Sequence, residues 1–249
     1  MQIVKTFMEN FAGDNVRFLG RGFTVPGDHL GQQSQGFRWP YGPVALITPF
    51  NFPLEIPVLQ MMGALFMGNK VVVKPDVRGA ACVEQWVRFL HYCGMPTTDL
   101  DIMNGDGTAL GHLLRKDVVR MTLFTGSSAV AAKLTEATGG KIKIEDSGYD
   151  WKVLGPDVHD IDFVAHACDQ DAYAFSGQKC SAQSVLFVHK NWGEAGIYDK
   201  LKSLAERRTL DDLSITPVKY SKLYLRNLRS TKLEIIAGMI KLSSCSYLE

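Results

Sequence analysis

Short apolar runs alternate with helical patterns between Tyr41 and about Gly148. The runs are rich in branched side chains, as strands buried on both faces of a sheet are. They cover residues 44–49, 70–74, 100–104, 120–124 and 141–145, and helices are expected between them at about 54–67, 79–93, 107–115 and 127–138. Such alternation predicts an α/β fold with a Rossmann-like parallel sheet that helices cover on both faces.

Polar residues stand where the expected strands end, which is where parallel sheets bind their ligands. These residues are Asn51, Lys74, the Asn104–Gly107 turn, the Thr125–Ser128 junction and Glu145. Each has an ordinary alternative. Ser at a strand-to-helix junction suits a phosphate but is also a common helix cap, and taken alone the cap is favoured. Lys74 could bind a ribose or be a solvated strand end, and taken alone the second is favoured. Because no GxGxxG or Walker A motif is present, spacing alone does not establish a nucleotide site.

The run Phe175–Gln183 carries a candidate nucleophile, Cys180. Glycine, lysine and small polar neighbours indicate a tight, accessible turn, where a thiolate can act as a nucleophile. A carboxylate, Glu145, lies 35 residues upstream and could serve as a base. The alternative is an ordinary free thiol, and the local run alone does not decide between the two.

The rest of the chain is expected to add a second unit. We divide the sequence into an N-terminal segment at 1–40, a nucleotide-binding domain at 41–149, a partial second domain at 150–218 and a tail at 219–249. The first residues have the spacing of an amphipathic helix, without the features of a signal or transit peptide. In the second unit we expect helices at about 160–175 and 194–208, with a strand at 184–189 between them.

Composition and charge exclude several classes of function. A net charge of +1, with no lysine or arginine run, argues against nucleic acid or an anionic membrane as a partner. Prolines 43, 49, 53 and 57 interrupt the longest apolar stretch, so it is not a membrane span. Five cysteines without a CxxC pair fit a reducing compartment. The acids and histidines at 157–166 are interpreted as a solvated helix start, and no metal is expected. A small-molecule substrate is favoured.

Five motifs, in this order and spacing, resemble the aldehyde dehydrogenase superfamily. They are Thr48-Pro-Phe-Asn-Phe-Pro53, Gly68-Asn-Lys-Val-Val-Val-Lys-Pro75, Phe124-Thr-Gly-Ser-Ser128, Glu145 with Gly148, and Gly177-Gln-Lys-Cys-Ser-Ala182. Segments 27–43, 150–157 and 168–174 are more narrowly similar to plant-type mitochondrial delta-1-pyrroline-5-carboxylate dehydrogenases. The similarity runs from near the start to about Val218.

The resemblance implies a catalytic set and an NAD site. Cys180 is then the nucleophile that attacks glutamate semialdehyde, Asn51 an oxyanion donor and Glu145 the general base that activates water. NAD is implied to lie against Thr48, Pro49, Phe50, Lys74, Gly126 and Ser127. Ser181 is implied to help hold the substrate carboxylate. The product is glutamate, in proline catabolism, and the implied location is the mitochondrial matrix.

Two departures from the family affect these expectations. Many relatives have an acid where this chain has Val77, and this difference weakens the case for a strict preference for NAD over NADP. Relatives also continue through a Glu-x-Phe-Gly-Pro motif and a later oligomerisation strand that this sequence lacks. A truncated or spliced product is therefore expected. It could be an active enzyme, another semialdehyde dehydrogenase, or an inactive chain that binds nucleotide or associates with the full-length enzyme, and homo-oligomerisation stays open.

Overall fold

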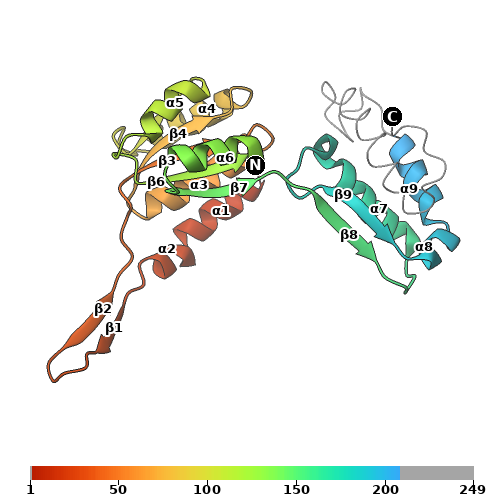
Figure 1. The fold of residues 1–249 in the computed structure, drawn as a ribbon, viewed down its shortest axis with the longest axis horizontal. Helices are drawn as coiled ribbons and strands as arrows, with labels where there is room; N and C mark the ends of the chain where they lie inside the picture. The colour runs from red at the N-terminus through yellow and green to blue at the C-terminus, as the bar shows by residue number, and fades with distance from the viewer. Residues whose placement is uncertain (1, 208–249) are drawn as a thin grey trace. The chain divides into compact units, whose positions relative to one another are not determined.

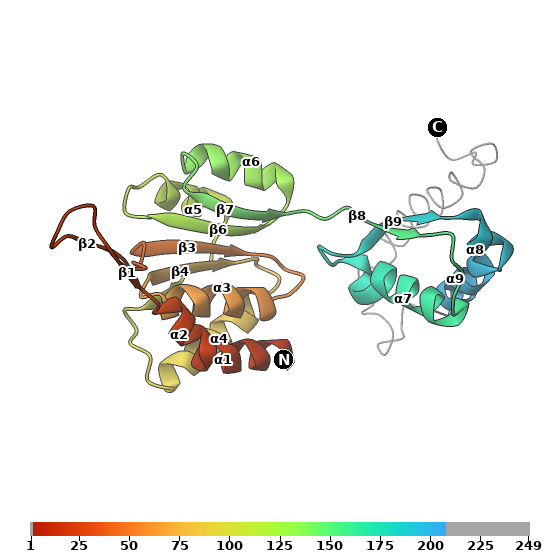
Figure 2. The same cartoon turned by 90° about the horizontal axis from the view of Figure 1, so that it is seen from below.

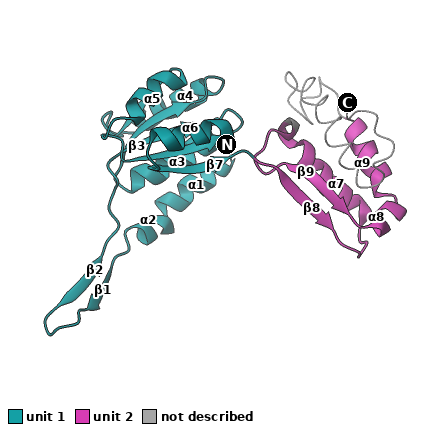
Figure 3. Ribbon diagram, viewed as in Figure 1, with its two compact units in different colours: residues 1–147 teal, residues 148–249 magenta. Residues whose placement is uncertain are grey.

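The computed structural model describes residues 2–207 and divides the chain into two compact units, 1–147 and 148–249 (Figure 3). Each unit is described by itself below. The tail expected at 219–249, together with the end of the second expected domain, lies outside the described residues.

Unit 1 is built on a five-stranded sheet in which every neighbouring pair is parallel (Figure 1). Its strands lie in the order β5-β4-β3-β6-β7. Their bounds are β3 Pro43–Thr48, β4 Lys70–Pro75, β5 Leu100–Ile102, β6 Met121–Gly126 and β7 Ile142–Asp146. The predicted parallel α/β fold is confirmed. Buried runs such as Val71 and Val73 in β4 form strands because branched side chains pack well on a pleated surface.

Helices cover both faces of this sheet (Figure 2). They are α3 Glu55–Phe66, α4 Ala80–Tyr92, α5 Gly107–Leu114 and α6 Ser128–Ala137, all close to the predicted ranges. Val44 and Leu46 of β3 pack with α3 and α4, whereas Ala45 and Ile47 pack with α5 and α6. Alternate side chains of one strand therefore enter two separate hydrophobic clusters, as the pleat of a strand requires.

The prediction that all five strands are buried on both faces is wrong for β7. Four of its five residues, Lys143–Asp146, are exposed. The reason is position, since β7 forms one edge of the sheet and has a single strand neighbour, β6. Glu145 lies in this exposed part of the strand.

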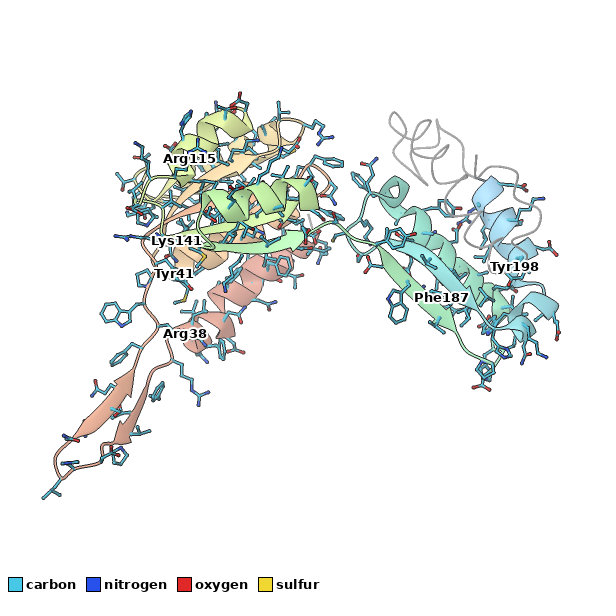
Figure 4. The ribbon with its side chains drawn as sticks, in the orientation of Figure 1. Arg38, Tyr41, Arg115, Lys141, Phe187 and Tyr198 are labelled. Atoms are coloured by element: carbon cyan, nitrogen blue, oxygen red, sulfur yellow. The ribbon has the colours of Figure 1, made fainter. Side chains whose placement is uncertain are left out.

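Two helices and a two-stranded ribbon precede the sheet. Helix α1, Gln2–Ala12, confirms the predicted amphipathic helix and buries Val4 against α3 in the first cluster. Helix α2, Asp14–Leu19, follows it, and the antiparallel strands β1, Phe23–Pro26, and β2, Gln33–Gly36, extend beyond the helices of unit 1 (Figure 1). At the base of the ribbon, the Arg38 guanidinium lies 4.4 Å from the centre of the Phe18 ring (Figure 4). This cation–π contact joins the returning chain to α2.

Unit 2 pairs strand β8, Asp150–Leu154, in parallel with β9, Gln183–Val188. Between them come α7, Ile161–Tyr173, and a 3₁₀ turn, Ala174–Gly177. After β9 come α8, Lys190–Glu194, and α9, Ile197–Glu206. Helix α9 confirms the helix predicted at about 194–208, whereas the short helix α8 was not predicted. Gly196, at φ 87°, leaves the right-handed region and separates α8 from α9.

A separate hydrophobic cluster forms the core of unit 2 and includes Leu154, Cys168, Leu186, Trp192 and Ile197. The Asp169 carboxylate on α7 is fully buried in the same region, and the Arg207 guanidinium reaches it at 3.2 Å from the end of α9. Tyr198 on α9 packs against this cluster, and burial raises the pKa of its hydroxyl (Figure 4).

Candidate active site

The order of the strands creates a topological switch point beside β3. From β3 the chain moves to β4 and β5 on one side, and it returns to β6 and β7 on the other. All five strands run parallel, so their carboxyl ends meet at one edge of the sheet. Open α/β sheets bind ligands outside the carboxyl ends of the strands at such a point. The segments after β3 and β6 flank it.

The segment after β3 carries Thr48, Pro49, Phe50 and Asn51. Thr48 is buried, and its hydroxyl has no hydrogen-bond partner within residues 2–207. Its carbonyl accepts the Asp76 N–H at 3.1 Å, which fixes the end of β3 beside the end of β4. Asn51 is half-buried and begins the turn that leads into α3.

The segment after β4 contains an ion pair that stacks on the first segment. Arg78 donates two hydrogen bonds to the Asp76 carboxylate at 2.8 and 2.9 Å, and its guanidinium lies 3.9 Å from the centre of the Phe50 ring. The side-chain hydrogen bond from Arg78 lowers the pKa of the Asp76 carboxyl, and the charge of Lys74 adds to that effect. Sequence reasoning missed Arg78, although a cation next to Val77 was a usable signal.

The segment between β6 and α6 holds Gly126, Ser127 and Ser128. Ser127 takes the N-cap position, but its side chain makes no capping hydrogen bond. The helix-cap interpretation of this serine is therefore wrong for its hydroxyl, although its backbone has cap geometry. Instead Ser128 and Ser147 bring their hydroxyls to 2.8 Å, and the Ser128 N–H points to the Ser147 hydroxyl at 3.3 Å. The N–H groups of a helix N-terminus make an anion-binding edge.

Glu145 lies on β7, opposite Thr125 of β6 in the register. Ser147 follows it at φ 54°, and its N–H donates to the Gly126 carbonyl at 2.8 Å. Glu145 therefore lies at the same end of the sheet as the serine segment.

Cys180 lies in a tight turn in unit 2, as predicted. The Ala182 N–H donates to the Lys179 carbonyl at 3.1 Å, which closes the turn around Cys180 and Ser181. Cys180 is half-buried and Ser181 is exposed. The preceding 3₁₀ turn has positive φ at Phe175 and Gly177, so the chain bends sharply before it reaches the thiol.

The other described cysteines have different surroundings. Cys82 and Cys93 are exposed, whereas Cys168 is buried in the core of unit 2. Burial raises the pKa of the Cys168 thiol, which keeps it protonated and unreactive at neutral pH. Cys245 lies outside the described residues.

Eight of the ten site residues that the sequence analysis names lie in unit 1. They are Thr48, Pro49, Phe50, Asn51, Lys74, Gly126, Ser127 and Glu145, all at or just after the carboxyl ends of strands. Cys180 and Ser181 share one turn in unit 2. A dinucleotide fits the donor set of the first group, which combines a helix N-terminus, a serine hydroxyl that does not cap its helix, the buried Thr48 hydroxyl and a lysine.

Residues 2–207 contain neither a cluster of metal ligands nor a helix suited to crossing a membrane. Within this range no group of three or more His, Cys, Asp or Glu side chains could hold a metal ion. None of the helices described for the chain is long and apolar enough to cross a membrane.

Known proteins match this chain over most of its length. A protein from Linum usitatissimum named probable aldehyde dehydrogenase is 62% identical over 218 residues, which are 88% of this chain and 40% of that protein. Delta-1-pyrroline-5-carboxylate dehydrogenase 12A1, mitochondrial, from Arabidopsis thaliana is 61% identical over 216 residues, or 87% of this chain and 39% of the relative. This chain therefore spans about two fifths of the length of these relatives.

A solved structure and a family pattern agree with these relatives. The crystal structure of an NAD-dependent aldehyde dehydrogenase from Sinorhizobium meliloti superposes with a TM-score of 0.77 at 26% identity, and the match covers 82% of this chain and 41% of that one. The pattern of the aldehyde dehydrogenase family matches residues 2–220. Together with the strand-end residues and the Cys180 turn, this match shows that the chain belongs to the aldehyde dehydrogenase family.

Proposed function

We propose that this chain carries the dinucleotide-binding and nucleophile-bearing parts of an NAD-dependent dehydrogenase that oxidises L-glutamate 5-semialdehyde to L-glutamate. The observation that carries this proposal is the Cys180 turn, which holds a half-buried thiol between Lys179 and Ala182. The 61% identity with the Arabidopsis enzyme supports this substrate over others. The Bacillus subtilis alpha-ketoglutaric semialdehyde dehydrogenase, at 31%, supports the broader class of semialdehydes.

The first step is the attack of the Cys180 thiolate on the aldehyde carbon. A carbon–sulfur bond forms, and the carbonyl oxygen takes the negative charge. The Asn51 side-chain amide and the Cys180 backbone N–H donate hydrogen bonds to that oxygen. Losing one donor of this kind typically costs about 100-fold to 1000-fold in rate.

NAD, when bound, supplies the acceptor for the hydride that leaves this carbon. Phe50 and Lys74 would hold its adenosine half, while Gly126 and Ser127 would offer backbone N–H groups, and Ser127 also its hydroxyl, to its pyrophosphate. The acyl group then remains on Cys180 as a thioester. Glu145 takes a proton from a water molecule, whose oxygen attacks the thioester and releases glutamate and the thiol. The net reaction consumes aldehyde, NAD and water and yields acid, NADH and a proton.

The test is NADH production by the purified chain given NAD and pyrroline-5-carboxylate, the cyclic form of the substrate. We expect turnover that Cys180→Ala abolishes and that Glu145→Gln slows at the hydrolysis step. Equal turnover in the wild type and Cys180→Ala would refute the proposed nucleophile. Comparable rates with other semialdehydes would still support a semialdehyde dehydrogenase, but they would contradict glutamate 5-semialdehyde as the specific substrate.

A second role is favoured by one observation, since the chain spans about two fifths of its relatives. A folded sample that binds NAD without producing NADH would indicate a chain that binds nucleotide or associates with the full-length enzyme. Co-purification with a tagged full-length relative distinguishes association from isolated binding. In either case we propose a mitochondrial location, following the name of the Arabidopsis relative.

A further inference from the structure

Gly148 lies so close to the backbone of the Cys180 turn that a side chain added there would meet main-chain atoms. A methyl group built on its α-carbon would come within 2.6 Å of the Cys180 carbonyl carbon and 3.0 Å of the Cys180 α-carbon, and closer still to the Cys180 carbonyl oxygen. Real β-carbons essentially never approach heavy atoms closer than 3.0 Å. Alanine at this position therefore cannot fit unless the backbone moves.

The requirement for glycine is steric and not conformational. Gly148 does not have the positive φ that favours glycine, whereas Gly177 and Gly196 of the same unit do. An alanine could adopt the backbone angles of Gly148, so its methyl group alone causes the conflict. The atoms in its way belong to the main chain, which cannot rotate aside as a flexible side chain can.

The surroundings of Gly148 determine whether an added methyl group displaces the Cys180 turn or the strands β8 and β9. Just after Gly148, Asp150 of β8 lies opposite Gln183 of β9, the register shifts between Asp150 and Trp151, and regular pairing from Trp151 opposite Val185 to Leu154 opposite Val188 holds the two strands together. The Cys180 turn is closed by the Ala182–Lys179 hydrogen bond at 3.1 Å and lies outside this ladder. A displacement at Gly148 therefore moves the turn more readily than it moves the strands.

We infer that Gly148 is a positioning residue that sets the place of the Cys180 thiol and of the Cys180 backbone N–H. This inference rests on the proposed function, because it gives both groups a role in the reaction. A side chain at Gly148 pushes the Cys180 peptide outward, opens the turn and takes the sulfur away from its attack position. Misplacement of a reacting group by about 1 Å can cost about 100-fold in rate.

The experiment compares Gly148→Ala with Gly155→Ala. Gly155 lies in the same unit, lacks a positive φ, and has no atom within 4 Å of the position that an added methyl group would take, so it is a matched control. In Gly148→Ala we expect kcat to fall about 100-fold, with the KM for NAD within about two-fold of wild type. Hydrogen exchange of the Ala182 amide should be at least about tenfold faster, because its bond to Lys179 opens. Gly155→Ala should match the wild type in all three measurements.

The outcomes separate this inference from the proposed function. Wild-type kcat and Ala182 exchange in Gly148→Ala would overturn the inference while leaving Cys180 as the nucleophile. Faster exchange with unchanged kcat would also overturn it, because the displaced turn would then not matter for the reaction. Turnover by Cys180→Ala would instead overturn the proposed function. If Gly148→Ala does not fold, Lys179→Gly is added to loosen the turn, and the double variant should fold with kcat still lowered relative to Lys179→Gly alone.

Discussion

At the scale of single residues, the Asp76–Arg78 pair gives a test in acid. Hydrogen bonding from Arg78 places the folded-state pKa of Asp76 below the unfolded value of about 3.9. The pair therefore stabilises the fold above pH of about 4, and this stability is lost as the pH falls through the folded pKa. Asp76→Asn should cost less than about 1 kcal/mol near neutral pH, because Arg78 is half exposed. The difference from wild type should disappear in strong acid.

Urea unfolding at neutral and acid pH measures this difference. Asp28→Asn is the control, since Asp28 forms no ion pair among the residues described. A difference between Asp76→Asn and wild type that grows as the pH falls would contradict the assigned sign.

Sequence reasoning found the strand-end residues but missed their contacts. Lys74 and Asn51 could be placed because a buried strand ends beside each of them. The stacking of Arg78 on Phe50 and the packing of Gly148 on Cys180 could not, since each joins segments that only the tertiary fold brings together. Propensity alone favours a cap for the serines after β6, and nothing in the local sequence indicates that the Ser127 hydroxyl makes no capping bond.

At the scale of elements, the N-termini of two helices of unit 1 differ: a side chain caps α5, whereas the N-cap side chain of α6 makes no capping bond. Asp106 caps α5 and accepts the N–H groups of Thr108 and Ala109 at 3.0 and 3.1 Å. Asp106→Ala should therefore lower the free energy of unfolding by about 1 kcal/mol. Ser127→Ala should lower it by no more than a few tenths of that, because its hydroxyl caps nothing on α6. Under the proposed function, Ser127→Ala should nevertheless weaken NAD binding several-fold.

Urea unfolding and NAD titration of both variants test whether Asp106→Ala lowers mainly stability and Ser127→Ala mainly NAD affinity. A stability loss in Ser127→Ala as large as that in Asp106→Ala would restore the cap interpretation. Unchanged NAD affinity in Ser127→Ala would remove its hydroxyl from the proposed dinucleotide site.

Periodic elements were predictable because one face of each packs on a core. Helices α3 to α6 and strands β3 to β7 begin and end within a few residues of the predicted bounds. The ribbon of β1 and β2 was not foreseen, since its residues are almost all exposed, β2 has no apolar side chain, and the alternation in β1 spans only four residues. Helix α8 was not foreseen, because its five residues are too few to show a helical period.

At the scale of the whole molecule, the described hydrophobic clusters divide between the two units. The clusters built on β3 lie within unit 1, and the cluster around Leu186 and Trp192 lies within unit 2. Chains with separate cores commonly unfold in separate steps. We therefore expect hydrogen exchange along a urea series to give one midpoint for peptides of 43–75 and another for peptides of 183–204.

NAD should then shift only the first of these midpoints, because Thr48, Lys74 and Ser127 of the proposed site all belong to unit 1. A ligand that binds the folded state at about 100 times its Kd adds about 2.7 kcal/mol to the stability of the unit that holds it. Cys180→Ala should leave this shift unchanged, since Cys180 belongs to unit 2. A single midpoint shared by both sets of peptides would contradict separate unfolding, and a shift confined to 183–204 would move the proposed dinucleotide site to unit 2.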